Sequence, residues 1–170
     1  MDLLIVRHAI AFERDRNRWK DDTQRPLSPE GMQRARHAAS GLRHLVKAPD
    51  RLLTSPLVRA RQTADILTDV ARWPHPLETP ELAPGMPLQQ VLDLLAQQQH
   101  ACVAVVGHQP DLGRLLGACL LGSHPAELPV DLKKPGVVCV SFDKPVRAGR
   151  GTLKWFASPH LLRLLRKSKQ

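Results

Sequence analysis

Two histidines in this chain directly follow short apolar runs that end abruptly. Arg7-His8 follows the run Leu3-Leu4-Ile5-Val6, and Gly107-His108 follows the run from Ala101 to Val106. A neutral imidazole is a competent nucleophile, and histidine is among the residues that form covalent catalytic intermediates. If both runs are parallel strands of one α/β sheet, the two imidazoles lie at its carboxyl edge, where such sheets bind ligands.

Arginines accompany these histidines. Arg7 precedes His8, and Arg59 follows Ser55-Pro56 after a third apolar run, from Arg51 to Thr54. A phosphoryl group in transfer carries negative charge on three equatorial oxygens, so its catalysis depends on positioning and positive charge. Arginine supplies forked donors that stay charged, and the helix N-termini expected after these strands add partial positive charge. These residue types together predict a site for phosphoryl transfer.

Each of these residues also has a simpler explanation when it is taken alone. A single histidine at a strand end is usually a polar residue with satisfied hydrogen bonds. An arginine near a helix start is usually solvated, although its charge opposes the helix dipole there. The occurrence of two histidines and two arginines at one predicted sheet edge favours a phosphate site over these separate explanations.

The elements predicted around these residues alternate between strand and helix. Apolar runs predict strands at 3–6, 51–54, 101–106, 137–142 and 152–156, and the helical pattern predicts helices at 29–46, 57–70, 88–98, 111–121 and 159–167. Ser28-Pro29 and Ser55-Pro56 are helix start signals, with serine as the N-cap. A short helix near Arg14 to Lys20, a weak strand within 77–86 and a Pro-rich loop at 123–135 complete the prediction. Alternation of this kind is typical of α/β proteins with a mostly parallel sheet.

Composition limits the class of protein. The 170 residues are 42% hydrophobic but only 4% aromatic, which predicts one domain over residues 1–170 with an aliphatic core. Cys102, Cys119 and Cys139 lie in apolar stretches and are expected to be buried free thiols in a reducing compartment. No apolar run reaches the roughly 18 residues of a membrane span. The N-terminus lacks the order of charge and apolar residues that a signal peptide has, which predicts a cytoplasmic protein.

The chain is strongly basic, with a formal net charge of +9 and an isoelectric point near 10.2. The charge has two interpretations: solvated arginines on an ordinary surface, or an anionic partner. The scarcity of aromatic residues argues against a surface that stacks nucleic-acid bases. Lys133-Lys134 is expected to be solvated, with a place at the pocket mouth as the alternative. The same choice, solvent or an acidic partner, applies to the terminal basic residues Arg163, Arg166, Lys167 and Lys169.

Four motifs, in order along the chain, resemble the histidine phosphatase superfamily, which includes the phosphoglycerate mutases. They are Leu-Ile-Val-Arg-His-Ala at 4–9, Arg-Pro-Leu-Ser at 25–28 with Gly31, Ser-Pro-Leu-Val-Arg-Ala at 55–60 with Gln62-Thr63, and Val-Gly-His-Gln-Pro at 106–110. The short length and Pro80-Glu81-Leu82 are most similar to the SixA-type phosphohistidine phosphatase branch. The resemblance implies a single-domain three-layer α/β/α sandwich of the phosphoglycerate mutase type.

The same resemblance implies a role for each matching residue. His8 corresponds to the nucleophile that accepts the phosphoryl group, and Arg7 and Arg59 correspond to two phosphate-binding arginines. His108 corresponds to the second histidine of the pocket, and Arg25 corresponds to an arginine that faces the phosphate. Neither a metal nor an organic cofactor is implied.

The proton donor is the open question of this assignment. Many members of the superfamily protonate an alkoxide leaving group with a carboxylic acid, and Glu81, with Glu78 nearby, is the candidate here. Resemblance to the SixA-type branch implies that no carboxylic acid is well placed for this step. A phosphoramidate needs less acid assistance than an ester, because its leaving group can depart as neutral imidazole. A solvated or loop-capping carboxylate is the alternative for Glu81.

Three functions follow from these observations. The first is removal of phosphate from phosphohistidine in a protein, and the second is hydrolysis of a small phosphate ester. Both would release inorganic phosphate through a phosphorylated His8. The third is a phosphate- or nucleic-acid-binding module without catalysis, against which the four residues Arg7, His8, Arg59 and His108 argue. No membrane partner is expected.

Overall fold

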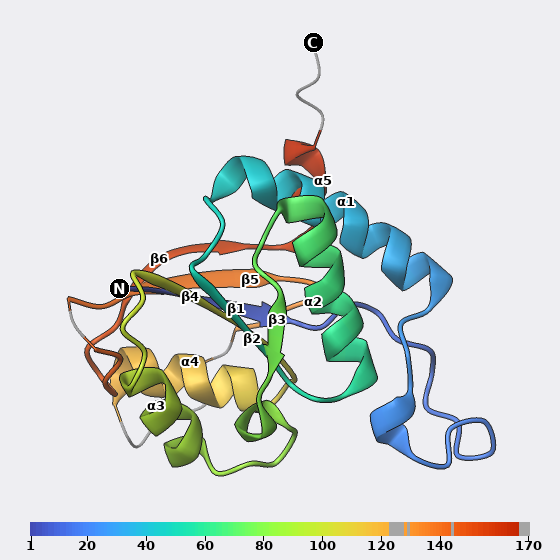
Figure 1. Cartoon of the computed structure of the whole chain (residues 1–170), viewed down its shortest axis with the longest axis horizontal. Coiled ribbons are helices and arrows are strands. Elements are labelled where there is room, and N and C mark those ends of the chain that lie inside the picture. Colours follow the sequence, from blue (N-terminus) through green and yellow to red (C-terminus); the bar gives the residue numbers. More distant parts are fainter. Residues whose placement is uncertain (123–127, 129, 144, 167–170) are drawn as a thin grey trace.

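A six-stranded sheet with helices on both faces forms the structure (Figure 1). The computed structural model describes residues 1–122, 128, 130–143 and 145–166. The strands are β1 (Asp2–Arg7), β2 (Arg51–Thr54), β3 (Pro76–Glu78), β4 (Cys102–Gly107), β5 (Val137–Ser141) and β6 (Thr152–Ala157). The helices are α1 (Pro29–Leu45), α2 (Val58–Ala71), α3 (Leu88–Ala96), α4 (Asp111–Leu121) and α5 (Pro159–Leu165), with short 3-10 helices η1 (Asp22–Gln24) and η2 (Pro80–Leu82).

The sheet is mostly parallel, as the sequence predicted. The strand order is β3-β2-β4-β1-β5-β6, in which β3, β2, β4 and β1 are parallel neighbours. The last two strands reverse direction in turn, since β5 pairs antiparallel with β1 and β6 pairs antiparallel with β5. The antiparallel β5 therefore starts at the edge of the sheet where β1 ends.

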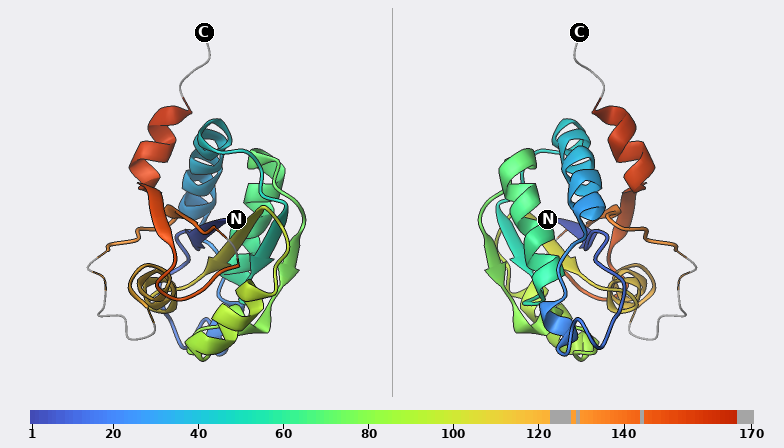
Figure 2. Two further views of the ribbon diagram at one scale, coloured as in Figure 1. Left: turned by 90° about the vertical axis from the view of Figure 1, so that its left-hand side faces the viewer. Right: turned by 90° about the vertical axis from the view of Figure 1, so that its right-hand side faces the viewer.

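The helices form two layers, which gives the predicted three-layer α/β/α arrangement. Helices α1, α2 and α5 cover one face of the sheet, and α3 and α4 cover the other (Figure 1, Figure 2). The alternation of side chains along β1 serves both layers: Leu4 and Val6 belong to the first core, and Leu3 and Ile5 belong to the second. Burial on both faces explains why this strand is an unbroken apolar run.

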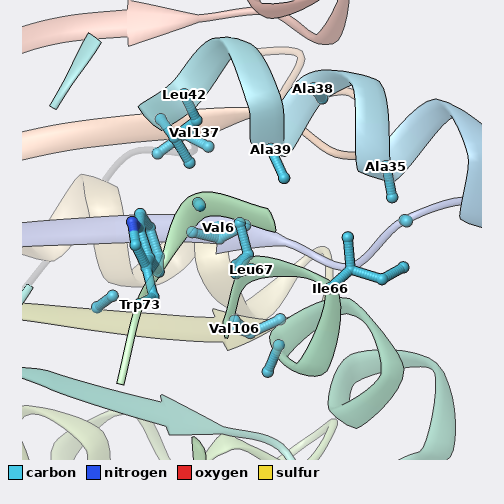
Figure 3. Close-up of a cluster of buried hydrophobic side chains, with 14 of the residues drawn as sticks. Val6, Ala35, Ala38, Ala39, Leu42, Ile66, Leu67, Trp73, Val106 and Val137 are labelled. Atoms are coloured by element: carbon cyan, nitrogen blue, oxygen red, sulfur yellow. The ribbon is translucent and has the colours of Figure 1, made fainter. Parts of the chain in front are cut away.

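Small side chains let α1 lie close to the sheet. In the first core Ala35, Ala39 and Leu42 of α1 line up above Val6 and Val137 (Figure 3). All five are at most 3% exposed. The labelled side chains of this core are aliphatic apart from Trp73, in line with the low aromatic content of the sequence.

The start of α1 is fixed to the chain that leaves β1. The hydroxyl of Ser28 accepts a hydrogen bond from the amide of Gly31 at 3.0 Å, and Pro29 is the first helical residue. A Cβ atom on Gly31 would lie 1.8 Å from the carbonyl oxygen of Ile10. Glycine therefore permits a close approach between α1 and the segment that follows His8.

Two local predictions were wrong, and one falls partly outside the described residues. No α-helix forms near Arg14 to Lys20, where only turns are present, and the one short helix in this loop is η1. Ser55 does not cap α2, whose N-cap is Leu57, because its hydroxyl bonds with His108. Residues 123–127 and 129 of the predicted Pro-rich loop, like Lys167 and Lys169, lie outside the part that the structure describes.

The three cysteines are free, as expected, with Cys119 and Cys139 buried and Cys102 partly buried. Burial raises the pKa of Cys119 to about 12 and that of Cys139 to about 11, which leaves both thiols protonated and poorly nucleophilic. None of the helices in the described residues combines the length and hydropathy that a membrane crossing requires.

Candidate active site

Strand register brings the two histidines together at the carboxyl edge of the parallel strands. Arg7 of β1 is paired with Gly107 of β4, so the next residue on each strand is a histidine. The amide of His8 donates to the carbonyl of Gly107 at 3.0 Å. The ring centroids of His8 and His108 lie 4.9 Å apart, with an angle of 51° between the ring planes.

His8 is held with one ring nitrogen engaged. Its Nδ1 lies 2.6 Å from the carbonyl oxygen of Ala9, and because a carbonyl only accepts, Nδ1 must carry the proton of the neutral ring. The amide of Ala9 in turn donates to Thr63 Oγ1 on α2, at 2.9 Å. This arrangement leaves the lone pair of the neutral imidazole on Nε2, which is the atom needed for nucleophilic attack.

Burial keeps His8 neutral. The side chain is 6% exposed, and desolvation, as the largest cause, lowers its pKa to about 2. The neighbouring His108 and the positive charges of Lys134 and Arg59 lower the pKa of His8 as well, whereas the hydrogen bond to Ala9 acts in the opposite direction. A neutral His8 at physiological pH is the form that can attack phosphorus.

His108 is buried beside it and is also neutral. Its Nε2 lies 2.8 Å from Ser55 Oγ, and its Nδ1 is buried without a hydrogen-bond partner among the described residues. Desolvation, followed by the positive charge of Arg59, lowers the pKa of His108 to about 3. Ser55 Oγ also accepts from the amide of Leu57 at 3.4 Å, and among the described residues Nε2 is the one acceptor for its proton, which favours the hydroxyl as donor to Nε2 and the ring proton of His108 on Nδ1.

Two arginines lie at this edge of the sheet, and the charge of Arg59 acts on both histidines. Arg59 is 4% exposed, and its Nη1 donates to the backbone oxygen of Asp22 at 2.7 Å. Arg7 donates from Nη1 to the carbonyl of Leu132, also at 2.7 Å. Burial lowers the pKa of each guanidinium, but arginine remains charged in proteins.

Unpartnered nitrogens are concentrated at this site. Six buried side-chain nitrogen or oxygen atoms of the described residues have no hydrogen-bond partner, and three of them are Arg7 Nε, Arg59 Nε and His108 Nδ1. Buried donors normally have partners, so each exception needs an explanation. A phosphoryl group, with three oxygens that only accept, would satisfy donors of this kind.

Asp22 ties Arg59 to Arg25. Its carboxylate lies 2.8 Å from Arg25 Nε and 3.2 Å from Arg59 Nη2. Arg25 also donates from Nη1 to the carbonyl of Phe12 at 2.6 Å. The guanidinium of Arg25, predicted to contact substrate, is thus bonded to the loop, and its link to the other pocket residues runs through Asp22.

Three further residues contribute to the pocket without a clear signal in the sequence. Asp22 lies in a polar stretch without a clear period, which gives no local signal, and the Ser55-Pro56 pattern predicts a helix cap. Lys134 was expected to be solvated, but it is half-buried, and the charges of Arg7, Arg25 and Arg59 act with burial to lower its pKa. The missing signal was strand direction: Arg7 bonds to the carbonyl of Gly136 at 3.1 Å, so the segment before the antiparallel β5 must lie at this edge.

Glu81 lies on η2, near the same edge. The amide of Thr79 donates to the carbonyl of Thr54 at 2.8 Å, which places η2 just beyond the end of β2. Glu81 and His108 line one cavity of about 50 Å³, whose other walls are mainly apolar residues of α3 and α4. The carboxylate is therefore near the pocket, and its role stays a prediction.

Comparison with known proteins identifies the family of this chain. Residues 3–83 match the histidine phosphatase superfamily (branch 1). The phosphohistidine phosphatase SixA of Escherichia coli is 30% identical over 169 residues, which cover 96% of this chain and 98% of SixA. The chain therefore belongs to the histidine phosphatase superfamily.

Two further relatives extend the comparison. An uncharacterized protein of Picosynechococcus sp. is 39% identical over 141 residues, or 81% of this chain and 83% of that protein. A solved structure of the protein histidine phosphatase SixA complexed with tungstate has a TM-score of 0.77 and 29% identity, covering 95% of this chain and 99% of the other. The predicted phosphoglycerate mutase-like fold and the similarity to SixA are thereby confirmed.

Proposed function

We propose that this protein is a phosphatase that removes the phosphoryl group from phosphohistidine in a protein, through a phosphorylated His8. The observation that carries the proposal is the state of His8: it is neutral, with its Nδ1 proton bound to Ala9 and Nε2 available. It lies against a second neutral histidine, and the positive charges of the buried Arg59 and the half-buried Lys134 act on it. The geometry supplies a nucleophile and a positive anion site together.

The reaction has two displacements at phosphorus. In the first, the Nε2 lone pair of His8 forms a P–N bond while the P–N bond to the substrate histidine breaks. The substrate ring, protonated on its other nitrogen, leaves as neutral imidazole. In the second, water attacks phosphorus, the P–Nε2 bond breaks and inorganic phosphate leaves, while the proton of the water goes to solvent or to phosphate. No step requires a metal or an organic cofactor.

The pocket residues have distinct roles in this scheme. Arg7 and Arg59 bind the phosphoryl oxygens with charged donors. His108 donates a hydrogen bond from Nδ1 to a phosphoryl oxygen and stabilises its negative charge in the transition state. Arg25 positions Arg59 through Asp22, and Lys134 adds positive charge. The substrate class rests on similarity to SixA, a phosphohistidine phosphatase, and on a leaving group that needs no acid.

The test measures phosphate release from a phosphohistidine-bearing protein by wild type and by His8→Ala, in the presence of EDTA. We expect release by wild type and none above background by His8→Ala. The matched control is His44→Ala, which removes an exposed histidine on α1 and should leave the rate unchanged. Rapid quenching should also trap an acid-labile phosphoenzyme in wild type only. Release that persists in His8→Ala would refute the mechanism.

Hydrolysis of a small phosphate ester is the second candidate, because Glu81 shares a cavity with His108. An alkoxide leaving group needs a proton, and Glu81 is the carboxylic acid on this side of the pocket. Glu81→Gln should then slow ester turnover much more than phosphohistidine turnover. Equal effects on the two substrates would remove the acid role and favour the first function.

A further inference from the structure

A wide basic groove opens next to the phosphoryl pocket. Its volume is about 800 Å³, and it is bounded by the N-terminal half of α1, the segment before β5, and the junction of β6 and α5. Arg7 and Lys134 line it. Arg7 directly precedes the nucleophile in the chain, and the charge of Lys134 lowers the pKa of His8 and His108. The groove therefore borders the site of chemistry at Lys134.

The walls of the groove carry an excess of positive charge. Arg34, Lys133 and Arg163 join Arg7 and Lys134 there, against one carboxylate, Asp131. Arg34 is paired with Glu30 at 2.5 Å, and Lys133 lies 3.6 Å from Asp131, but both pairs are solvent-exposed and weak. Arg163 forms no ion pair with any residue that the structure describes.

An apolar element lies among these charges. Phe156 of β6 lines the groove and is 38% exposed, although a large aromatic side chain is normally more buried. The arrangement of one exposed aromatic residue within a polar, charged rim is typical of a surface that binds another protein. The volume is also far larger than a phosphate group needs, and it falls in the range that holds a large ligand.

We propose that this groove binds the segment of the protein substrate next to the phosphorylated histidine, and that this segment is rich in Asp and Glu. This inference rests on the proposed function, and it further specifies that the substrate segment beside the phosphohistidine is negatively charged. Acidic side chains would meet Lys133 and Arg163 while the phosphoryl group enters past Arg7. A protein segment is favoured over a nucleic acid because, among the described residues that line the groove, Phe156 is the one Phe, Trp or Tyr side chain, and base stacking uses several.

The test compares two phosphohistidine peptides of one length, with either glutamate or glutamine beside the phosphohistidine, and the free phosphohistidine amino acid. For wild type, we expect kcat/KM for the glutamate peptide to exceed that for the glutamine peptide by about tenfold, with the difference shrinking as salt is added. The double variant Lys133→Glu, Arg163→Glu should lose this preference. The change in kcat/KM for free phosphohistidine, which has no flanking residues, reports any separate effect of the double variant on the phosphoryl pocket.

The control variant is Arg43→Glu, which makes the same charge reversal on an exposed part of α1 away from the groove, and it should keep the preference. If the double variant folds poorly, the milder Lys133→Gln and Arg163→Gln changes replace it, each expected to reduce the preference about two- to threefold.

Equal wild-type rates on the two peptides would overturn the groove assignment and leave the proposed function intact. Stronger inhibition by an oligonucleotide than by polyglutamate would overturn the assignment to a protein segment. Failure to release phosphate from any of the three compounds would refute the proposed function itself, and the groove assignment with it.

Discussion

The hydrogen bond between Ser55 and His108 gives the sharpest prediction. Ser55 is fully buried, His108 is 4% exposed, and Oγ lies 2.8 Å from Nε2. Removal of the hydroxyl in Ser55→Ala leaves Nε2 buried without a partner, which costs about 1–3 kcal/mol. Part of this cost appears as lower stability. The remainder appears as a change of tautomer, because Nε2 no longer has a donor that keeps the proton on Nδ1.

The tautomer change should slow catalysis. With the proton on Nε2, Nδ1 presents a lone pair to the phosphoryl oxygens instead of a donor. The upper limit is reached when none of the 1–3 kcal/mol appears as lower stability, and kcat/KM then falls roughly 5- to 150-fold. Because free phosphohistidine has no flanking chain, its turnover is the suitable assay, alongside the free energy of unfolding in urea.

Nitrogen-15 NMR of the His108 ring supplies a readout that a purely structural role would not change. Wild type should show a protonated Nδ1 and an unprotonated Nε2, and Ser55→Ala should show the proton shared or moved. Ser40→Ala, in the middle of α1, is the matched control and should alter neither the rate nor the ring signals. A wild-type spectrum with the proton on Nε2, or an unchanged rate in Ser55→Ala, would refute this reasoning.

Three further predictions concern the same region. In the native protein the pKa values of His8 and His108 are lowered to about 2 and 3, so below pH 6.5 the unfolded chain binds protons that the native chain does not. The stabilisation is fully present above this pH, and the free energy of unfolding should fall by roughly 2 kcal/mol per histidine from pH 7 to pH 5. In His8→Asn the free energy of unfolding should depend less steeply on pH. Arg59→Lys keeps the positive charge but loses the forked guanidinium that reaches both the carboxylate and the backbone oxygen of Asp22. We expect kcat/KM to fall about 10- to 100-fold. A value within twofold of wild type would contradict this prediction. Gly31→Ala places a Cβ against a backbone oxygen and should lower the free energy of unfolding by about 3 kcal/mol or more in urea, whereas the control Gly113→Ala meets only a flexible side-chain end and should be tolerated.

Much of the fold was readable from local sequence patterns. The unbroken apolar runs predicted β1 and β4, because a strand buried on both faces has no polar face to show. Ser28-Pro29 predicted the start of α1, where both the cap and the first helical residue are defined by a few consecutive residues. The order of strands and helices then indicated a mostly parallel sheet, and the carboxyl edge of that sheet indicated where His8 and His108 would lie.

The details of the site depended on contacts between segments far apart in the chain. Ser55-Pro56 has the local pattern of a helix cap, but the position of His108 across the sheet makes its hydroxyl a histidine partner instead. Asp22 reaches Arg59 only because the loop after β1 folds back over α2.

The direction of β5 determines the position of Lys134. Lys134 approaches the pocket because β5 runs antiparallel to β1, so the residues before β5 come to the edge where β1 ends. Sequence by itself determined which elements form and which residue types follow each strand, since those depend on neighbours within a few positions. The tertiary structure alone decided the antiparallel direction of β5 and the register of the strands, and with them which distant side chains surround His8, because these follow from the packing of the whole sheet.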